Sequence, residues 1–155
     1  TWDTTPDDLD AHLYVPGNGC TAATVKHDNK GSMSITPFAK LERDSTEDVS
    51  NLGNASETIR VGLDSNDLYA KCGSTYEYYV HDFTNKDNTN SQFELSNAQV
   101  KVYYDGTLKE TISYKDEGES KDATSDKYWR VFQLKGDQIE PVKINSTSGS
   151  APAFL

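Results

Sequence analysis

Hydrophobic and polar residues alternate with a period of two over most of this chain, a pattern typical of β-strands rather than helices. The clearest example is residues 9–15, where four aliphatic residues alternate with Asp10, His12 and Tyr14. We expect a strand there with one apolar and one polar face. The same pattern, bounded by turn residues, predicts further strands near 25–27, 32–38, 58–63, 76–83, 128–134 and 139–144.

Residues 100–112 are predicted to form a β-hairpin. A three-residue loop at 104–106 would set Val102 opposite Leu108 and collect the aliphatic side chains on one face, with Gly106 in the left-handed conformation. A two-residue Asp-Gly turn is the alternative, and it would mix the two faces. We therefore expect the three-residue loop.

Seven to nine short strands separated by turn signals predict an all-β fold, an antiparallel β-sandwich of the immunoglobulin-like or jelly-roll kind. Residues 1–144 form one predicted module, and the small polar residues of 145–155 are typical of a linker. Residues 42–56 are polar, with one helical turn expected, and the charged stretch 115–127 predicts a mobile loop.

The charge balance excludes two classes of partner. The chain has 155 residues, of which 25 are acidic and 15 basic, for a formal net charge of −10. This negative charge repels nucleic acid and anionic lipid, so we expect neither as a partner. No run approaches the roughly 18 consecutive apolar residues of a membrane span, so we expect no membrane insertion.

The two cysteines, Cys20 and Cys72, are predicted to form a disulfide. A reactive thiol is the alternative, and the absence of a short Cys spacing argues against a cysteine-based metal site. Together with the polar composition, the predicted disulfide indicates a secreted or cell-surface protein.

Several acidic residues are candidate metal ligands. Asp8, Asp10 and His12 fall on one side of the first predicted strand. Calcium takes six to eight oxygen ligands, which Asp44 and Asp82 would help to supply. Calcium is therefore the cofactor that this oxygen-rich set suits.

The histidines suggest a different metal. His12 with His81 would suit zinc or another transition metal, and His27 is a further candidate donor. In the alternative without a metal, Asp8 caps a turn and His12 donates a hydrogen bond to a carboxylate. No EF-hand or zinc-finger spacing is present, so the sequence leaves these hypotheses open.

Aromatic residues gather on the later predicted strands. Exposed Tyr and Trp side chains can stack on sugar rings or anchor a protein partner, whereas buried ones pack in the core or form cross-strand pairs. The candidate ligand-binding residues are Tyr14, Tyr79, His81, Tyr103 and Trp129.

Residues 2–13 read W-D-T-T-P-D-D-L-D-A-H-L. This segment resembles a module of bacterial secreted and surface-anchored proteins that begins W-x-x-x-P-x-D-L-D-x-H-L and occurs beside immunoglobulin-like and adhesin domains. The Y-V-H-D-F of residues 79–83 is the second specific match, and weaker matches lie at 57–59, 98–103 and 129–132. The chain departs from the module at 41–46, where Arg43 interrupts an acidic run, and in a longer polar insertion before Glu57.

The resemblance implies an extracellular β-sandwich that binds or spaces rather than catalyses. We expect a non-catalytic module of a bacterial surface or secreted multidomain protein, whose partners are a glycan, a cell-surface protein or neighbouring domains. A carbohydrate-binding module, calcium-dependent or not, within a secreted glycan-degrading system is the alternative. The sequence has no G-x-S-x-G motif. Paired carboxylates for glycoside hydrolysis are an alternative, but a sandwich of 155 residues offers little room for a deep cleft, so we do not expect an enzyme.

Overall fold

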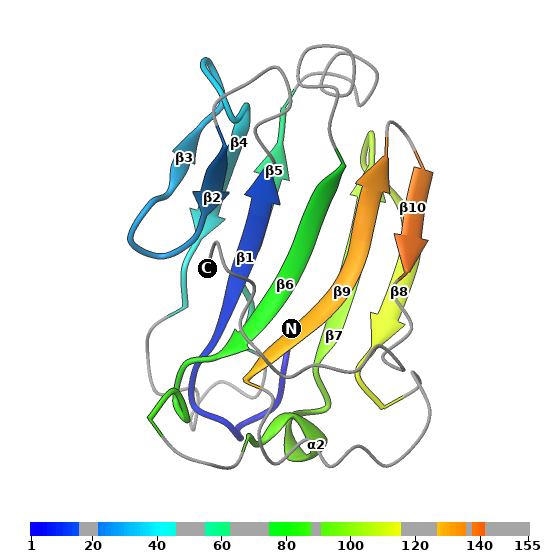
Figure 1. The fold of residues 1–155 in the computed structure, drawn as a ribbon. Coiled ribbons are helices and arrows are strands. Elements are labelled where there is room, and N and C mark those ends of the chain that lie inside the picture. The colour runs from blue at the N-terminus through cyan, green and yellow to red at the C-terminus, as the bar shows by residue number, and fades with distance from the viewer. Residues whose placement is uncertain are drawn as a thin grey trace.

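The computed structural model describes residues 1–15, 22–45, 55–62, 75–87, 91–115, 127–135 and 138–141. Within them the chain forms ten strands and one short helix (Figure 1). The elements are β1 (Leu9–Val15), β2 (Ala23–Val25), β3 (Gly31–Ser32), β4 (Ala39–Arg43), β5 (Thr58–Val61), β6 (Tyr76–Asp82), α2 (Phe93–Ser96), β7 (Gln99–Tyr104), β8 (Thr107–Ser113), β9 (Tyr128–Lys135) and β10 (Gln138–Pro141). The predicted all-β antiparallel sandwich is confirmed, with ten strands in these residues rather than seven to nine.

One layer is a five-stranded antiparallel sheet in the order β10-β9-β6-β1-β2. β1 lies inside this sheet, paired with β6 on one side and with β2 on the other. Both faces of β1 are covered, so its polar face is not at the surface: Asp10 and His12 are each only 2% exposed. The strand predicted from residues 9–15 therefore has a buried polar face.

The other layer consists of two separate sheets, β3-β4-β5 and the β7-β8 hairpin. Each packs on the large sheet through its own hydrophobic cluster. Under β3-β4-β5 lie Leu13, Val25, Leu41 and Tyr76 with their neighbours. Under the hairpin the cluster is centred on aromatic residues, among them Trp2, Phe93, Tyr114, Trp129 and Phe132. The core thus has two halves that share one sheet.

The prediction of a three-residue hairpin loop is wrong. Tyr104 pairs with Thr107 across a two-residue turn, in which Asp105 and Gly106 have φ values of 48° and 72°. Two successive positive φ values match the twist of the flanking strands. A register shift between Val102 and Tyr103 then changes the pairing, so that Val100 lies opposite Ile112. The aliphatic side chains of β7 therefore stay on the same face as Ile112 despite the short turn.

The strand predicted at 32–38 is also wrong, except for Ser32 at the end of β3. The chain turns here, because the Phe38 amide donates to the Ile35 carbonyl oxygen at 2.7 Å and Phe38 has a φ of 55°. Extended pairing resumes only at β4. Helix α2 was not predicted.

Several predictions fall outside the described residues. They concern the disulfide between Cys20 and Cys72, the tail at 145–155, and nearly all of the loop at 115–127. Among the described helices none has the length and apolar character needed to cross a membrane.

Candidate metal centre

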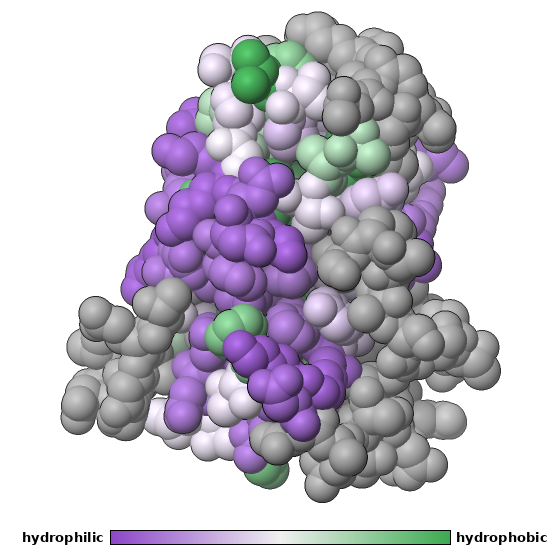
Figure 2. Space-filling view, turned by 60° about the vertical axis from the view of Figure 1, so that its left-hand side comes forward, coloured by the Kyte–Doolittle hydropathy of each residue, from purple (hydrophilic) through white to green (hydrophobic). Residues whose placement is uncertain are grey.

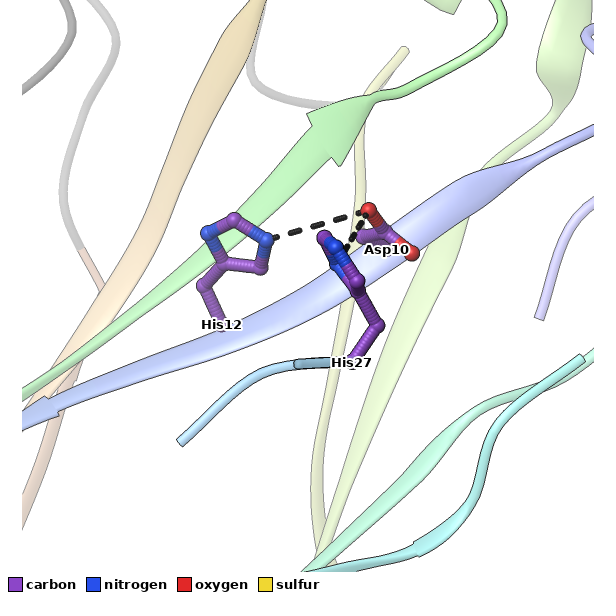
Figure 3. A group of neighbouring side chains, drawn as sticks. All are labelled: Asp10, His12 and His27. Carbon is purple, nitrogen blue, oxygen red and sulfur yellow. Dashed lines mark ion pairs between the residues drawn. The ribbon is translucent and has the colours of Figure 1, made fainter. Parts of the chain in front are cut away.

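All three histidines of the chain surround one carboxylate oxygen, Oδ2 of Asp10. The distances to this oxygen are 3.1 Å from His27 Nδ1, 3.7 Å from His81 Nδ1 and 3.9 Å from His12 Nε2. Figure 3 shows the His12 and His27 rings directed toward the Asp10 carboxylate. Three imidazoles and one carboxylate therefore converge on a single point.

Two strands of the large sheet and one turn beside it supply these side chains. Asp10 and His12 alternate along β1 and so share a face. His81 on β6 lies directly opposite Asp10 in the antiparallel ladder. His27 lies in the turn closed by the Lys26–Asn29 bridge, just after β2, which pairs with β1 on its other side. The order β6-β1-β2 therefore brings together residues that are up to 71 positions apart, from Asp10 to His81.

The polar atoms at this point are buried, and no described residue forms a hydrogen bond of good geometry with them. This holds for Asp10 Oδ2, both ring nitrogens of His12, His27 Nδ1 and His81 Nδ1. Asp10 and His12 are 2% exposed and His81 is 8% exposed. A buried polar atom without a partner costs about 1–3 kcal/mol, and native proteins contain few of them. Such a concentration points to a missing common partner.

A metal ion fits between the ligand atoms of Asp10, His12 and His27. Bonds of about 2.0–2.1 Å in a tetrahedral zinc site place neighbouring ligand atoms about 3.3 Å apart. The 3.1–3.9 Å separations from Asp10 Oδ2 lie near that spacing. Ligand atoms of Asp10, His12 and His27 all lie within 4.8 Å of one another, and His81 adjoins this group through Asp10.

The protonation states suit a cation. Burial lowers the pKa of His12, which keeps its ring neutral and able to donate a lone pair at neutral pH. Burial alone would raise the pKa of Asp10, but its interactions with His12, His81 and His27 outweigh burial and lower it. The centre therefore combines an ionised carboxylate with at least one neutral imidazole.

Further carboxylates lie on the other side of Asp10. Ligand atoms of Asp8, Asp10 and Glu57 lie within 4.8 Å of one another, and Lys30 Nζ lies 3.0 Å from the Asp44 carboxylate. Glu57 is held in place because it accepts backbone hydrogen bonds from Ala11 at 2.5 Å and Ser45 at 3.4 Å.

This crowding changes the acidities of the carboxylates. Burial, reinforced by the negative charges of Asp10 and Asp44, raises the pKa of Asp8 to about 6. Burial also raises the pKa of Glu57, to about 8, and the negative charges of Asp10 and Asp44 add to this increase. A positive ion nearby would relieve this repulsion.

Aromatic rings enclose the histidines. Tyr128 stacks on His81 with centroids 4.3 Å apart and planes 10° apart. Phe83 presents its ring at a steep angle to both His27 and His81, at 5.4 Å and 5.9 Å. These contacts fix ring orientation and limit solvent access, as an apolar shell does around a metal site.

Four predicted metal ligands lie at or next to this centre, and one does not. Asp10 and His12 are in it, and Asp8 and Asp44 lie on its carboxylate side. Asp82 points elsewhere: its carboxylate is fully buried and accepts hydrogen bonds from Asn85 and from the Gln92 amide. Asp82 therefore organises the loop that follows β6.

The sequence pattern does not single out Glu57, and it indicates His27 only as a further donor. The available signal was the rarity of histidine: with three in 155 residues, two of them followed by Asp, a shared site was a reasonable expectation.

The predicted ligand-binding aromatic residues are not brought together. Tyr79 is buried and donates to Glu77 at 2.6 Å, and Trp129 is buried against Phe93 and Tyr114. Tyr14 is half-buried on β1, and His81 lies beside Asp10 in the candidate metal centre. Of this predicted set, Tyr103 alone is exposed, at 58%.

Comparisons with models of protein families, with curated proteins and with solved structures found no match. The site must therefore be interpreted from its own chemistry.

Proposed function

We propose that this chain is a metal-binding β-sandwich module that holds one transition-metal ion, zinc in the first instance, through His12, His27, His81 and Asp10. The observation that carries the proposal is the convergence of all three histidines on one oxygen of a buried carboxylate, with ring nitrogens that have no other partner. The structural context is a non-catalytic module of a secreted or surface-attached bacterial protein, as the sequence resemblance implies.

The donor set favours a transition metal over calcium at this point. Imidazole nitrogen suits zinc, copper, nickel and iron, whereas calcium is bound by oxygen atoms alone. The oxygen atoms of Asp8, Asp44 and Glu57 are the donors that calcium would use, and they lie beside the histidines rather than among them. We expect zinc to bind more tightly than calcium.

Four protein ligands and limited exposure favour a structural role for the ion. Closed four-ligand sites stabilise folds, whereas catalytic zinc keeps an open coordination position. The His27 side chain is 34% exposed, and the other three ligands are almost fully buried. The turn carrying His27 lies toward the predominantly hydrophilic face in Figure 2, the side of β2 and β3. The ion would tie this turn to β1 and β6 and so hold a surface loop in one shape for a partner.

Isothermal titration of the metal-free protein tests the proposal. We expect one equivalent of zinc to bind, and we expect His27→Gln to weaken binding at least tenfold. His27 is the partly exposed ligand, so its replacement should leave the fold intact. Asp28→Asn is the matched control, because Asp28 lies in the same turn and, among the described residues, forms its ion pair with Lys26 rather than with the histidines.

Cobalt substitution supplies an independent spectroscopic measurement. We expect the strong visible absorption of four-coordinate cobalt in the unmodified protein and its weakening in His27→Gln and His81→Gln. Absence of zinc binding, or binding that is equally strong in both histidine variants while they remain folded, would overturn the proposal.

Glycan binding is the second candidate, favoured by one observation. Tyr103 and Tyr104 are exposed at 58% and 45% near the tip of the β7-β8 hairpin. Exposed tyrosines of this kind can stack on sugar rings. A glycan array probed with the unmodified protein and with Tyr103→Ala tests it: the candidate requires a signal that the substitution removes.

A further inference from the structure

The second layer of the sandwich is interrupted between β5 and β7. β5 is the edge of its sheet, β7 belongs to a separate hairpin, and neither pairs with the other. The two strands run in the same direction, upward in Figure 1. A cavity of about 320 Å³ lies between them, with Trp2, Tyr78 and Trp129 among its floor residues and Ile59, Val100 and Val102 along its borders.

The first residues of the chain already pair with both borders of this gap. Thr1 and Gln99 exchange both backbone hydrogen bonds, each 2.9 Å long, as a hydrogen-bonded pair of an antiparallel ladder does. Trp2 donates its amide to the Ala55 carbonyl oxygen at 3.1 Å in an antiparallel bridge. Thr1 and Trp2 therefore form the end of a strand between the two sheets.

The β7 ladder fixes where such a strand would continue. Because Thr1 pairs with Gln99 in antiparallel fashion, the residue before Thr1 would lie opposite Val100, and the two before that opposite Lys101 and Val102. Val100 and Val102 pack against the core, whereas Lys101 is exposed.

The β5 ladder gives the same answer independently. Extended from the Trp2–Ala55 bridge, it places the residue before Thr1 opposite Glu57, and the next two opposite Thr58 and Ile59. Thr58 is exposed, and Ile59 packs toward the core. Both borders therefore direct the residue before Thr1 inward, the next one outward and the third inward.

Within the described part of the chain, backbone groups on both sides of the gap lack a strand partner. The Ala98 carbonyl accepts from Tyr114 on the β8 side, so the alternate residues Gln99 and Lys101 direct their backbone groups toward the gap. On β5, the Gly62 amide donates to Phe38 on the β4 side, so Ile59 directs its backbone groups toward the gap. Unpaired strand edges of this kind are templates for a further strand.

We propose that the gap between β5 and β7 is a β-strand acceptor, and that its occupant is an extended segment joined to the amino group of Thr1, antiparallel to both strands. The occupant alternates apolar and polar residues, with an apolar residue directly before Thr1. It converts the second layer into one continuous sheet, β3-β4-β5, the new strand, then β7-β8. The inference is independent of metal binding.

The Thr1 amino group agrees with this placement. It donates where an antiparallel ladder ordinarily has a peptide N–H. Burial, with the nearby Lys101 charge, lowers the pKa of this amine to about 6. The Thr1 nitrogen thus lies where the peptide nitrogen of an added antiparallel strand would lie.

The test fuses six residues to Thr1. One version carries three Thr-Val repeats, so that valine precedes Thr1; the control carries three Val-Thr repeats, with the same composition and the opposite facing. We expect the first extension to raise the Tm by more than about 5 °C and to slow amide exchange at Lys101 and Ile59. The control should do neither. Equal effects of both extensions, or no effect of either, would overturn the proposal.

Two further measurements sharpen the result. Lys101→Pro removes a backbone donor that faces the gap but leaves the β7-β8 bonds, so the gain in Tm on extension should disappear, whereas Lys101→Thr should retain it. Each variant is compared with its own unextended form. The free Thr-Val peptide, added to the unextended chain, tests whether the added strand comes from another molecule. If the free peptide binds in the gap but the fused peptide has no effect on the Tm, the assigned connection to Thr1 is overturned.

Discussion

Asp10 and Asp82 are both buried aspartates at the same end of the large sheet, yet their surroundings give them different roles. Asp10 is surrounded by imidazole nitrogens without partners, whereas Asp82 accepts hydrogen bonds from Asn85 and Gln92. A carboxylate that already accepts hydrogen bonds from neutral donors is a structural anchor, whereas one surrounded by imidazole nitrogens is suited to a shared cation, as we propose for Asp10. The two residues were indistinguishable as candidate ligands in the sequence.

Asp82→Ala separates these roles. The substitution leaves the Gln92 amide and the Asn85 side chain without their buried acceptor, so we expect a loss of about 2–4 kcal/mol in the free energy of unfolding. Zinc affinity should stay within about twofold of the unmodified protein. Urea unfolding in chelator and zinc titration measure the two quantities. A large loss of zinc affinity in a folded variant would instead make Asp82 a ligand.

Glu57 is predicted to make the metal-free protein less stable as the pH rises. Its pKa is raised from 4.5 to about 8, mainly by burial, so its contribution to stability is complete below about pH 4.5 and is lost as the pH rises through the folded value. Each pH unit in this window weakens folding by about 1.4 kcal/mol at most. Glu57→Gln should remove that part of the slope.

Urea unfolding of both proteins in chelator at pH 5, 6.5 and 8 tests this. The stability difference between Glu57→Gln and the unmodified protein should shift in favour of the variant as the pH increases. A difference that stays constant across the three pH values would contradict the assignment.

At the scale of elements, β1 shows how position in a sheet changes the meaning of an alternating pattern. Alternation correctly predicts that Asp10 and His12 share a face. It does not show that this face is buried, because burial depends on β2, β6 and the turn at His27 covering it. The hairpin shows the same dependence on strand pairing, because the register shift near Tyr103 keeps the aliphatic side chains of β7 on the same face as Ile112 although the turn has only two residues.

Two glycines in the left-handed region, Gly31 at the start of β3 and Gly106 in the hairpin turn, should differ in the stability lost when each is replaced by alanine. Gly31 has a φ of 71°, and an added Cβ would collide with the Ala39 carbonyl oxygen and Val25. Gly106 has a φ of 72°, but the added Cβ would meet nothing within 4 Å. We expect Gly106→Ala to cost about 1–2 kcal/mol from backbone strain alone, and Gly31→Ala to cost at least twice as much. Urea unfolding of the two variants checks the order, and equal costs would contradict it.

At the scale of the whole molecule, the proposed metal ligands join elements that are distant in sequence. His27 follows β2, Asp10 and His12 lie on β1, and His81 lies on β6, so an ion would link three neighbouring parts of the large sheet. Binding to the folded state alone raises global stability by mass action.

Thermal unfolding with zinc should therefore show a shift. At one hundred times the dissociation constant, a stabilisation of about 2.7 kcal/mol corresponds to a rise in Tm of roughly 5–10 °C for a chain of this size. Excess chelator should reverse it, calcium should give a smaller shift, and His27→Gln, with its zinc affinity reduced at least tenfold, should give about half the shift or less. A calcium shift equal to or larger than the zinc shift would move the main ion to the carboxylate side of Asp10.

The sequence by itself determined the fold class and part of the centre. Period-two alternation is a local property, so it predicted the β-sandwich, most strands and the shared face of Asp10 and His12. Tertiary structure decided what depends on strand order. Asp10 lies opposite His81 and near His27 only because β1 pairs between β6 and β2, and the gap beside Thr1 exists only because β5 and β7 remain apart. Backbone pairing between distant segments leaves no mark in local periodicity, so these features could be found only in the folded chain.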